Sequence, residues 1–241
     1  MLSVEDMRKG KGCMDKQIIL DELKHLVGEQ QEVDLMSFYQ ALPLTYRGVV
    51  FDVGTEEVTM IVQPPDSVCL TWDAEVYLLG PEPIDLLRAD VVSFDIASGT
   101  VKLRNFRYGG PHLGKRMITR VIPSENLKVN VSKDGATFST VMLDISSQGV
   151  GIKLEADVDG VSLKKGQQVQ VTMHLPNQKV PAVGVVTTVD AAGDEQHISI
   201  VFKEEEIDIR PVWQYISHRR MEILQELQEK YLTAYMKGTG G

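Results

Sequence analysis

Two arginines separated by three residues, Arg116 and Arg120, form a candidate anion-binding pair. A guanidinium is permanently charged and planar, and it donates two parallel hydrogen bonds. It can therefore bind phosphate oxygens or the O6 and N7 edge of guanine, and it can stack on a base. The spacing alone is common, so two exposed arginines flanking Met117 and Ile118 are the alternative.

A second polar cluster runs from Asp144 to Gly149 with the sequence DISSQG, at the end of an apolar alternating segment. The Asp144 carboxylate can accept hydrogen bonds from N1 and N2 of guanine, and the Ser146 hydroxyl can donate to phosphate or base. Gly149 permits a close backbone approach or a positive φ angle. The alternative is a plain Asp and Ser turn closed by glycine. This pattern is rarer by composition than the arginine pair and is more informative.

Residues 96–124 contain six basic residues and no Asp or Glu, although the chain has a net charge of −9. The basic residues are Lys102, Arg104, Arg107, Lys115, Arg116 and Arg120. A solvated surface usually mixes its charges, so this window indicates a site for a compact anion. A basic strand edge that discourages aggregation is an equally weighted alternative.

The segments before this window predict short helices and then a first group of strands. Apolar spacing predicts a helix from residue 15 to 27 and a second one over 33–41, which Pro43 ends. From Leu44 the β-branched segments separated by Gly, Pro, Asp and Ser predict a small barrel or sandwich. The expected strands are 47–53, 56–62, 67–72, 75–80, 89–97 and 99–106.

The segments after the window predict a second barrel and a long helix. Asp134-Gly135 between two alternating apolar runs indicates a β-hairpin. About six strands follow from residue 116 onward, over 85 residues. The apolar repeat from Ile209 to Tyr231 predicts a helix, with Asp208 as its cap. We favour packing of its apolar stripe within the chain over a coiled-coil or homodimer contact.

The composition excludes several classes of protein. The two cysteines, Cys13 and Cys69, have no CxxC partner and form neither a disulfide framework nor a zinc site. Neither a signal peptide nor a membrane span is expected, so we predict a cytoplasmic protein. A pI near 5.1 argues against binding a nucleic acid polymer. No hydrolase, metalloprotease or phosphate-loop motif occurs, so we expect no catalytic residues, no metal and no cofactor.

The combination RxxxR, hairpin and DxSxxG resembles the PilZ domain family. The resemblance implies a six-stranded barrel that binds cyclic di-GMP. Arg116 and Arg120 would engage its phosphates and guanine faces, and Asp144, Ser146 and Gly149 would lie on the barrel surface against guanine. Lys115, directly before the first motif, is also expected to touch the ligand. The upstream strands resemble, by architecture, the N-terminal domain of two-domain PilZ proteins of the flagellar-brake type.

The predicted fold is mainly β, with two small antiparallel β-barrels, N-terminal helices and a long C-terminal helix. The first barrel is expected to be split-barrel-like and the second to be a six-stranded PilZ barrel. The expected segments are 1–43 (helical), 44–108 (PilZ-associated barrel), 109–115 (glycine-rich linker), 116–205 (PilZ domain) and 206–241 (C-terminal helix and tail).

The expected function is that of a bacterial cyclic di-GMP effector without enzymatic activity. Ligand binding would change the arrangement of the two domains and so regulate motility, adhesion or biofilm-related machinery. The protein partner would be a flagellar motor, pilus or polysaccharide machinery, and the chain itself could form a homodimer. A split-barrel flavin-binding enzyme and a ligand-independent PilZ adaptor are the alternatives.

Overall fold

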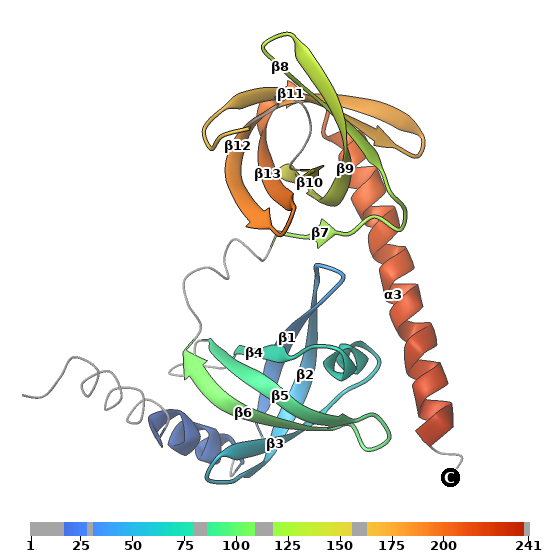
Figure 1. The fold of residues 1–241 in the computed structure, drawn as a ribbon. Helices are drawn as coiled ribbons and strands as arrows, with labels where there is room; N and C mark the ends of the chain where they lie inside the picture. Colours follow the sequence, from blue (N-terminus) through green and yellow to red (C-terminus); the bar gives the residue numbers. More distant parts are fainter. Residues whose placement is uncertain (1–16, 28–30, 80–85, 109–117, 156–162, 239–241) are drawn as a thin grey trace, which may run out of the picture. The chain divides into compact units, whose positions relative to one another are not determined.

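The computed structural model describes residues 17–27, 31–79, 86–108, 118–155 and 163–238. The described residues form a short helix over 17–27, two groups of strands and a long C-terminal helix (Figure 1). The prediction of a mainly β fold with two barrels is confirmed.

The chain divides into two compact units. The first comprises Met1–Tyr39, Pro43–Met117 and Leu224–Gly241, and the second comprises Gln40–Leu42 and Ile118–Ile223.

The strands of the first unit form a closed antiparallel barrel in the order β1-β2-β3-β6-β5-β4. Their bounds are β1 Glu32–Tyr39, β2 Leu42–Val53, β3 Glu57–Val62, β4 Glu75–Leu79, β5 Leu87–Asp95 and β6 Thr100–Tyr108. The barrel is filled by alternate side chains of each strand, because successive side chains of a strand point to opposite faces. Leu35, Met60, Leu78, Leu87 and Leu103 are fully buried.

Strand β1 overturns the predicted helix over 33–41. It pairs with β4, with Leu35 opposite Leu78 and Met36 opposite Tyr77, and this pairing closes the barrel. Apolar residues occupy both faces of β1, and such a run does not show the alternation of a half-buried strand. The following turn has positive φ at Gln40 and Ala41, without the Gly or Asn that usually marks a hairpin.

A short 3-10 helix, η1 (Asp66–Thr71), replaces the strand predicted over 67–72. Its backbone bonds are local, with Val68 N donating to Pro65 O at 3.1 Å and Trp72 N donating to Cys69 O at 2.9 Å. The four residues from Ser67 to Leu70 are all buried. A continuous apolar run does not distinguish a buried helical turn from a strand, and this ambiguity caused the wrong prediction.

Asp73, just after η1, is a half-buried carboxyl group that accepts a hydrogen bond from Phe38 N at 3.1 Å. Burial raises its pKa from 3.8 to about 6, and hydrogen bonds from Phe38 and Ser37 offset part of this effect. A carboxyl group with a raised pKa in the folded state binds protons more tightly there than in the unfolded chain. Its ionisation therefore lowers stability as the pH rises from about 4 to above 6.

We expect Asp73→Asn to remove this penalty, because the amide stays neutral and its oxygen can still accept from Phe38 N. The variant should exceed the wild type in stability by about 1–3 kcal/mol at pH 7, and the difference should shrink toward pH 4. Urea unfolding monitored by Trp72 fluorescence, in a Trp213→Phe background, measures it. An equal difference at both pH values would contradict the role of the Asp73 charge.

The strands of the second unit follow the order β10-β13-β12-β11-β8-β9-β7, and β10 also pairs with β9. That additional pairing closes six of the strands into the expected barrel, with β7 on the outer edge of β9. The bounds are β7 Arg120–Val121, β8 Lys128–Lys133, β9 Ala136–Ser146, β10 Gly149–Glu155, β11 Gln168–Leu175, β12 Gln178–Ala192 and β13 Glu195–Ile207. Val121, Val129, Ile145, Ile152 and Met173 are buried.

The hairpin predicted at Asp134-Gly135 is confirmed between β8 and β9. Asp134 has φ 50° and Gly135 has φ 84°. Two central residues with positive φ match the right-handed twist of the flanking strands, which is the reason Asp-Gly marks such turns. This hairpin sets the register of β9, the strand that ends in the DISSQG cluster.

The predicted C-terminal helix is α3 (Arg210–Gly238). Asp208 Oδ1 accepts a hydrogen bond from Arg210 N at 3.2 Å, in agreement with its expected capping role. Val212 and Ile216 are buried, so packing within the chain accounts for this part of the apolar stripe. Trp213, which was expected in the same stripe, is exposed.

Candidate ligand site

Strand β7 places Arg120 beside the DISSQG cluster. Arg120 lies directly opposite Ser146, and Val121 lies opposite Ile145, in the antiparallel pairing of β7 with β9. Residues directly opposite each other in such a pair have side chains on the same face. Val121 and Ile145 are fully buried inside the barrel, so Arg120, Asp144 and Ser146 belong to the outer face.

The guanidinium of Arg120 contacts the carboxylate of Asp144, with Nη1 and Oδ1 3.5 Å apart. The Arg120 side chain is 43% exposed and that of Asp144 is 28% exposed. Burial raises the pKa of Asp144 above its usual range, and the charge of Arg120 offsets part of this shift. Both groups are thus partly accessible and adjacent, and each has polar atoms that can contact a ligand.

The structure places the Ser146 hydroxyl in the turn between β9 and β10, and its contact with the ligand stays a prediction. Ser146 is only 3% exposed to solvent. The hydroxyl donates to Gly149 O at 3.3 Å and accepts from Gln148 N at 3.2 Å. The Ser146 side chain therefore stabilises the turn between β9 and β10, and its hydroxyl is already occupied there.

Position 149 requires a glycine because the backbone of β13 passes close to it. A Cβ atom at this position would lie 2.3 Å from the carbonyl oxygen of Ile200 on β13, which is shorter than any real contact. The φ angle of Gly149 is not positive, so a left-handed backbone does not explain why glycine is needed here. The close approach of the Ile200 carbonyl oxygen does. Gly149 thus lets β10 and β13 approach closely behind the turn.

Gly151 is a residue of this candidate site that the sequence did not indicate to us. It lies opposite Asp144 in the β9–β10 pairing, and a Cβ atom there would be 2.9 Å from Asp144 Oδ2. The absence of a side chain at Gly151 is what gives the Asp144 carboxylate its position. The sequence signal for Gly151 was its position two residues after Gly149, since residues two apart in a strand share a face.

A groove with a volume of about 520 Å³ lies next to the turn between β9 and β10. Gln148, Val201 and Trp213 are among its lining residues, and Val201 is opposite Gly149 in the β10–β13 pairing. Trp213 is 51% exposed and presents an aromatic ring to the groove. The sequence placed Trp213 among packing residues, because its spacing along α3 matched the buried stripe.

The first half of the arginine motif lies outside the described residues. Lys115 and Arg116 fall in the range 109–117, as does the predicted linker 109–115. Arg120 is therefore the residue of this motif whose contacts with the DISSQG cluster are described.

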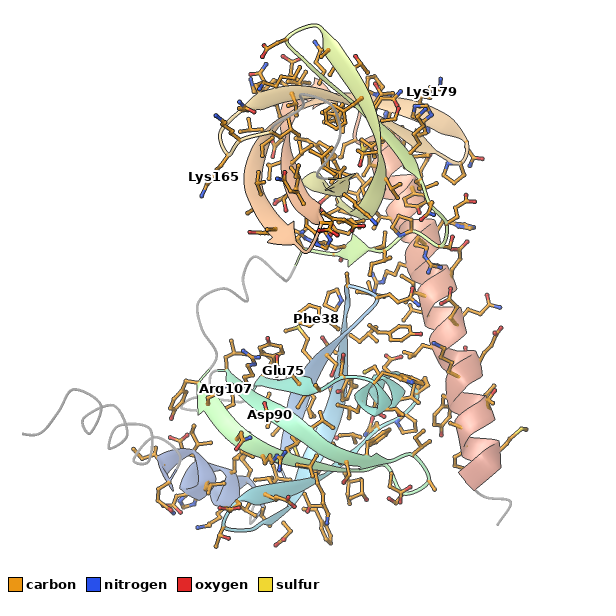
Figure 2. The ribbon with its side chains drawn as sticks, in the orientation of Figure 1. Phe38, Glu75, Asp90, Arg107, Lys165 and Lys179 are labelled. Carbon is orange, nitrogen blue, oxygen red and sulfur yellow. The ribbon has the colours of Figure 1, made fainter. Side chains whose placement is uncertain are left out.

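The basic window from 96 to 124 is divided between the two units. Lys102, Arg104 and Arg107 belong to β6 of the first barrel, whereas Arg120 belongs to the second. Arg107 Nη2 lies 3.0 Å from Asp90 Oδ1 and 3.2 Å from Glu75 Oε1, and Figure 2 shows these three side chains together. Acidic residues from other strands thus neutralise Arg107, which the linear sequence did not reveal.

The part of the chain that the structure describes contains no group of three or more His, Cys, Asp and Glu side chains able to hold a metal ion. Among its helices, none combines the length and the apolar character needed to cross a membrane.

Comparisons with known protein structures gave similarities at low identity. Inhibitor of motility MotI/DgrA from Bacillus subtilis is 14% identical, with 80% of this chain and 97% of that chain covered and a TM-score of 0.40. MrkH from K. pneumonia in complex with c-di-GMP is 12% identical, with 89% and 96% covered and a TM-score of 0.42. YcgR from Escherichia coli in complex with c-di-GMP is 12% identical, with 89% and 93% covered and a TM-score of 0.39. Similarity at these scores is too low to assign a function.

Comparison of the sequence with curated proteins and with protein-family models gives a more specific result than the structural similarities. No curated protein matches the chain significantly. The family model of the PilZ domain matches residues 115–216. This range contains both arginines of the first motif, the whole DISSQG cluster and the six-stranded barrel. Residues 115–216 therefore match a PilZ domain, and the strands of a separate β-barrel precede this domain in the sequence.

Proposed function

We propose that this protein is a non-enzymatic effector that binds cyclic di-GMP on the outer face of its PilZ barrel. The observation that supports this most directly is the contact of Arg120 with Asp144 on the face where β7 joins β9. A cation suited to phosphate and a carboxylate suited to the N1 and N2 donors of guanine thus lie within one nucleotide's reach. Arg116 and Lys115 would supply further positive charge to the same ligand.

In this proposal the site residues have two kinds of role. Arg120 and Asp144 contact the ligand and separate from each other when it binds. Ser146, Gly149 and Gly151 shape the surface, because they hold the turn and leave space above the strands. Guanine would lie against this smooth surface, and the ring of Trp213 in the neighbouring groove offers an aromatic wall.

Isothermal titration calorimetry with cyclic di-GMP tests the proposal. It measures the affinity and the number of nucleotides bound per chain in one experiment. Binding that weakens as salt concentration rises is expected, because the ligand carries two phosphates and the site carries arginines. Cyclic di-AMP is the matched control, since it keeps the phosphates and lacks the N1 and N2 donor pattern of guanine. Equal binding of both, or of neither, would contradict the proposal.

We further propose that ligand binding changes the arrangement of the two domains. The supporting feature is the position of Arg116 directly after the glycine-rich segment 109–115, which joins the two groups of strands. Ordering of a short segment by a ligand is a common way to convert binding into a signal. The signal would regulate motility, adhesion or biofilm-related machinery through a flagellar motor, pilus or polysaccharide complex.

Small-angle X-ray scattering measures this change. We expect the radius of gyration of the full chain to differ between the free state and saturating cyclic di-GMP, with no change for the Arg120→Ala variant. An unchanged scattering curve for the wild type, under conditions where calorimetry shows full binding, would refute the rearrangement and leave ligand binding intact.

A further inference from the structure

Arg219 of α3 is a buried arginine, only 4% exposed. Its three nitrogen atoms each donate a hydrogen bond within the second unit: Nε to Ile122 O at 3.0 Å, Nη1 to Glu222 Oε2 at 3.0 Å and Nη2 to Gln40 Oε1 at 2.7 Å. Arginine is almost never buried without such partners, because an unpaired buried charge is very unfavourable. The geometry of this side chain is therefore tightly defined.

The acceptor Ile122 O lies two residues after Arg120. Strand β7 has two residues, and among the described strands it pairs with β9 only. So short a pairing is a weak restraint on the backbone that carries Arg120. The bond from Arg219 Nε attaches the same segment to α3 just beyond the strand, where Pro123 restricts the chain further.

We propose that Arg219 is a positioning residue for the ligand site: through Ile122 O it holds β7 and thus the guanidinium of Arg120 over Asp144. This role rests on the proposed function, because it concerns the affinity of the same site. It also makes α3 part of the response to the ligand. A restraint that favours the binding geometry must, by thermodynamic linkage, be strengthened when the ligand binds.

The Arg219→Lys variant tests this role. Lysine keeps the positive charge but lacks the planar fork, so it cannot serve three acceptors in the same geometry. We expect its dissociation constant for cyclic di-GMP to rise about tenfold, which corresponds to about 1.4 kcal/mol. Arg220→Lys is the matched control, since it makes the same change at the adjacent, exposed position. Glu222→Gln removes the ion pair but not the bond to Ile122, so it should stay within about twofold of the wild type.

Hydrogen exchange of the free protein gives a second readout that requires no ligand. In Arg219→Lys the amides of residues 118–122 should exchange faster than in the wild type, whereas those of β11 should be unchanged and so show that the barrel is folded. Unaltered affinity or unaltered exchange at 118–122 would overturn the positioning role. An equal loss of affinity in Glu222→Gln would also overturn it. A wild type that does not bind cyclic di-GMP would instead refute the proposed function.

Discussion

Replacement of Arg120 by alanine is expected to weaken cyclic di-GMP binding by at least about 2 kcal/mol, roughly 30-fold or more in the dissociation constant. In the proposed site, the variant lacks the charge-assisted contact of the Arg120 guanidinium with phosphate or guanine. The domain itself should remain folded, because a partly exposed and 3.5 Å long ion pair such as Arg120–Asp144 contributes only about 1 kcal/mol or less to stability.

Calorimetry measures the affinity of Arg120→Ala, and thermal unfolding confirms the fold. Arg220→Ala is a suitable control, since it removes one exposed arginine from the same unit without touching the outer face of β7 and β9. The control should bind like the wild type. Equal affinities of all three proteins would show that Arg120 does not contact the ligand.

Replacement of Gly149 by alanine is expected to destabilise the PilZ barrel by about 2–4 kcal/mol. The new methyl group would collide with the carbonyl oxygen of Ile200, which is backbone and cannot rotate away. The strands must separate to relieve this contact, and the cost is that of overpacking a closely packed site. Chemical unfolding monitored by Trp213 fluorescence, in a Trp72→Phe background, measures the loss.

Gly151→Ala is the matched comparison. There the new methyl group meets the Asp144 side chain at 2.9 Å, and a side chain can turn aside. We therefore expect a smaller loss of stability, about 1 kcal/mol or less, together with weakened ligand binding because the carboxylate moves. Similar stability of both variants would contradict the distinction between backbone and side-chain contact.

Some local features of this protein follow from the sequence alone. The Asp134-Gly135 turn is confirmed because its two positive φ angles suit these residue types. The start of α3 is confirmed because Asp208 accepts from the first turn. Most strands were predictable from short β-branched runs between turn residues. These features depend on interactions between residues close in the chain, which the sequence displays directly.

The errors arose where distant residues decide the structure. Residues 32–39 form β1 because β4 offers a partner for closing the barrel, and η1 forms where a continuous apolar run is buried. The run over 33–39 and the run over 67–70 lack a clear period of 2 or 3.6. Their conformation was therefore determined by the rest of the barrel and not by their own pattern.

For the candidate site, the sequence determined which residue types are present, and the tertiary structure decided what each one contacts. The pairing of β7 with β9 brings Arg120 to Asp144 across 24 positions of sequence. The buried Ser146 hydroxyl bonds within its own turn. The close approach of the Ile200 carbonyl oxygen explains why position 149 is a glycine. Arg219 is 97 positions from its acceptor Ile122, so this contact was not visible from spacing at all. Strand pairing and burial bring such residues together. A linear motif gives no information about which strands pair or which side chains are buried.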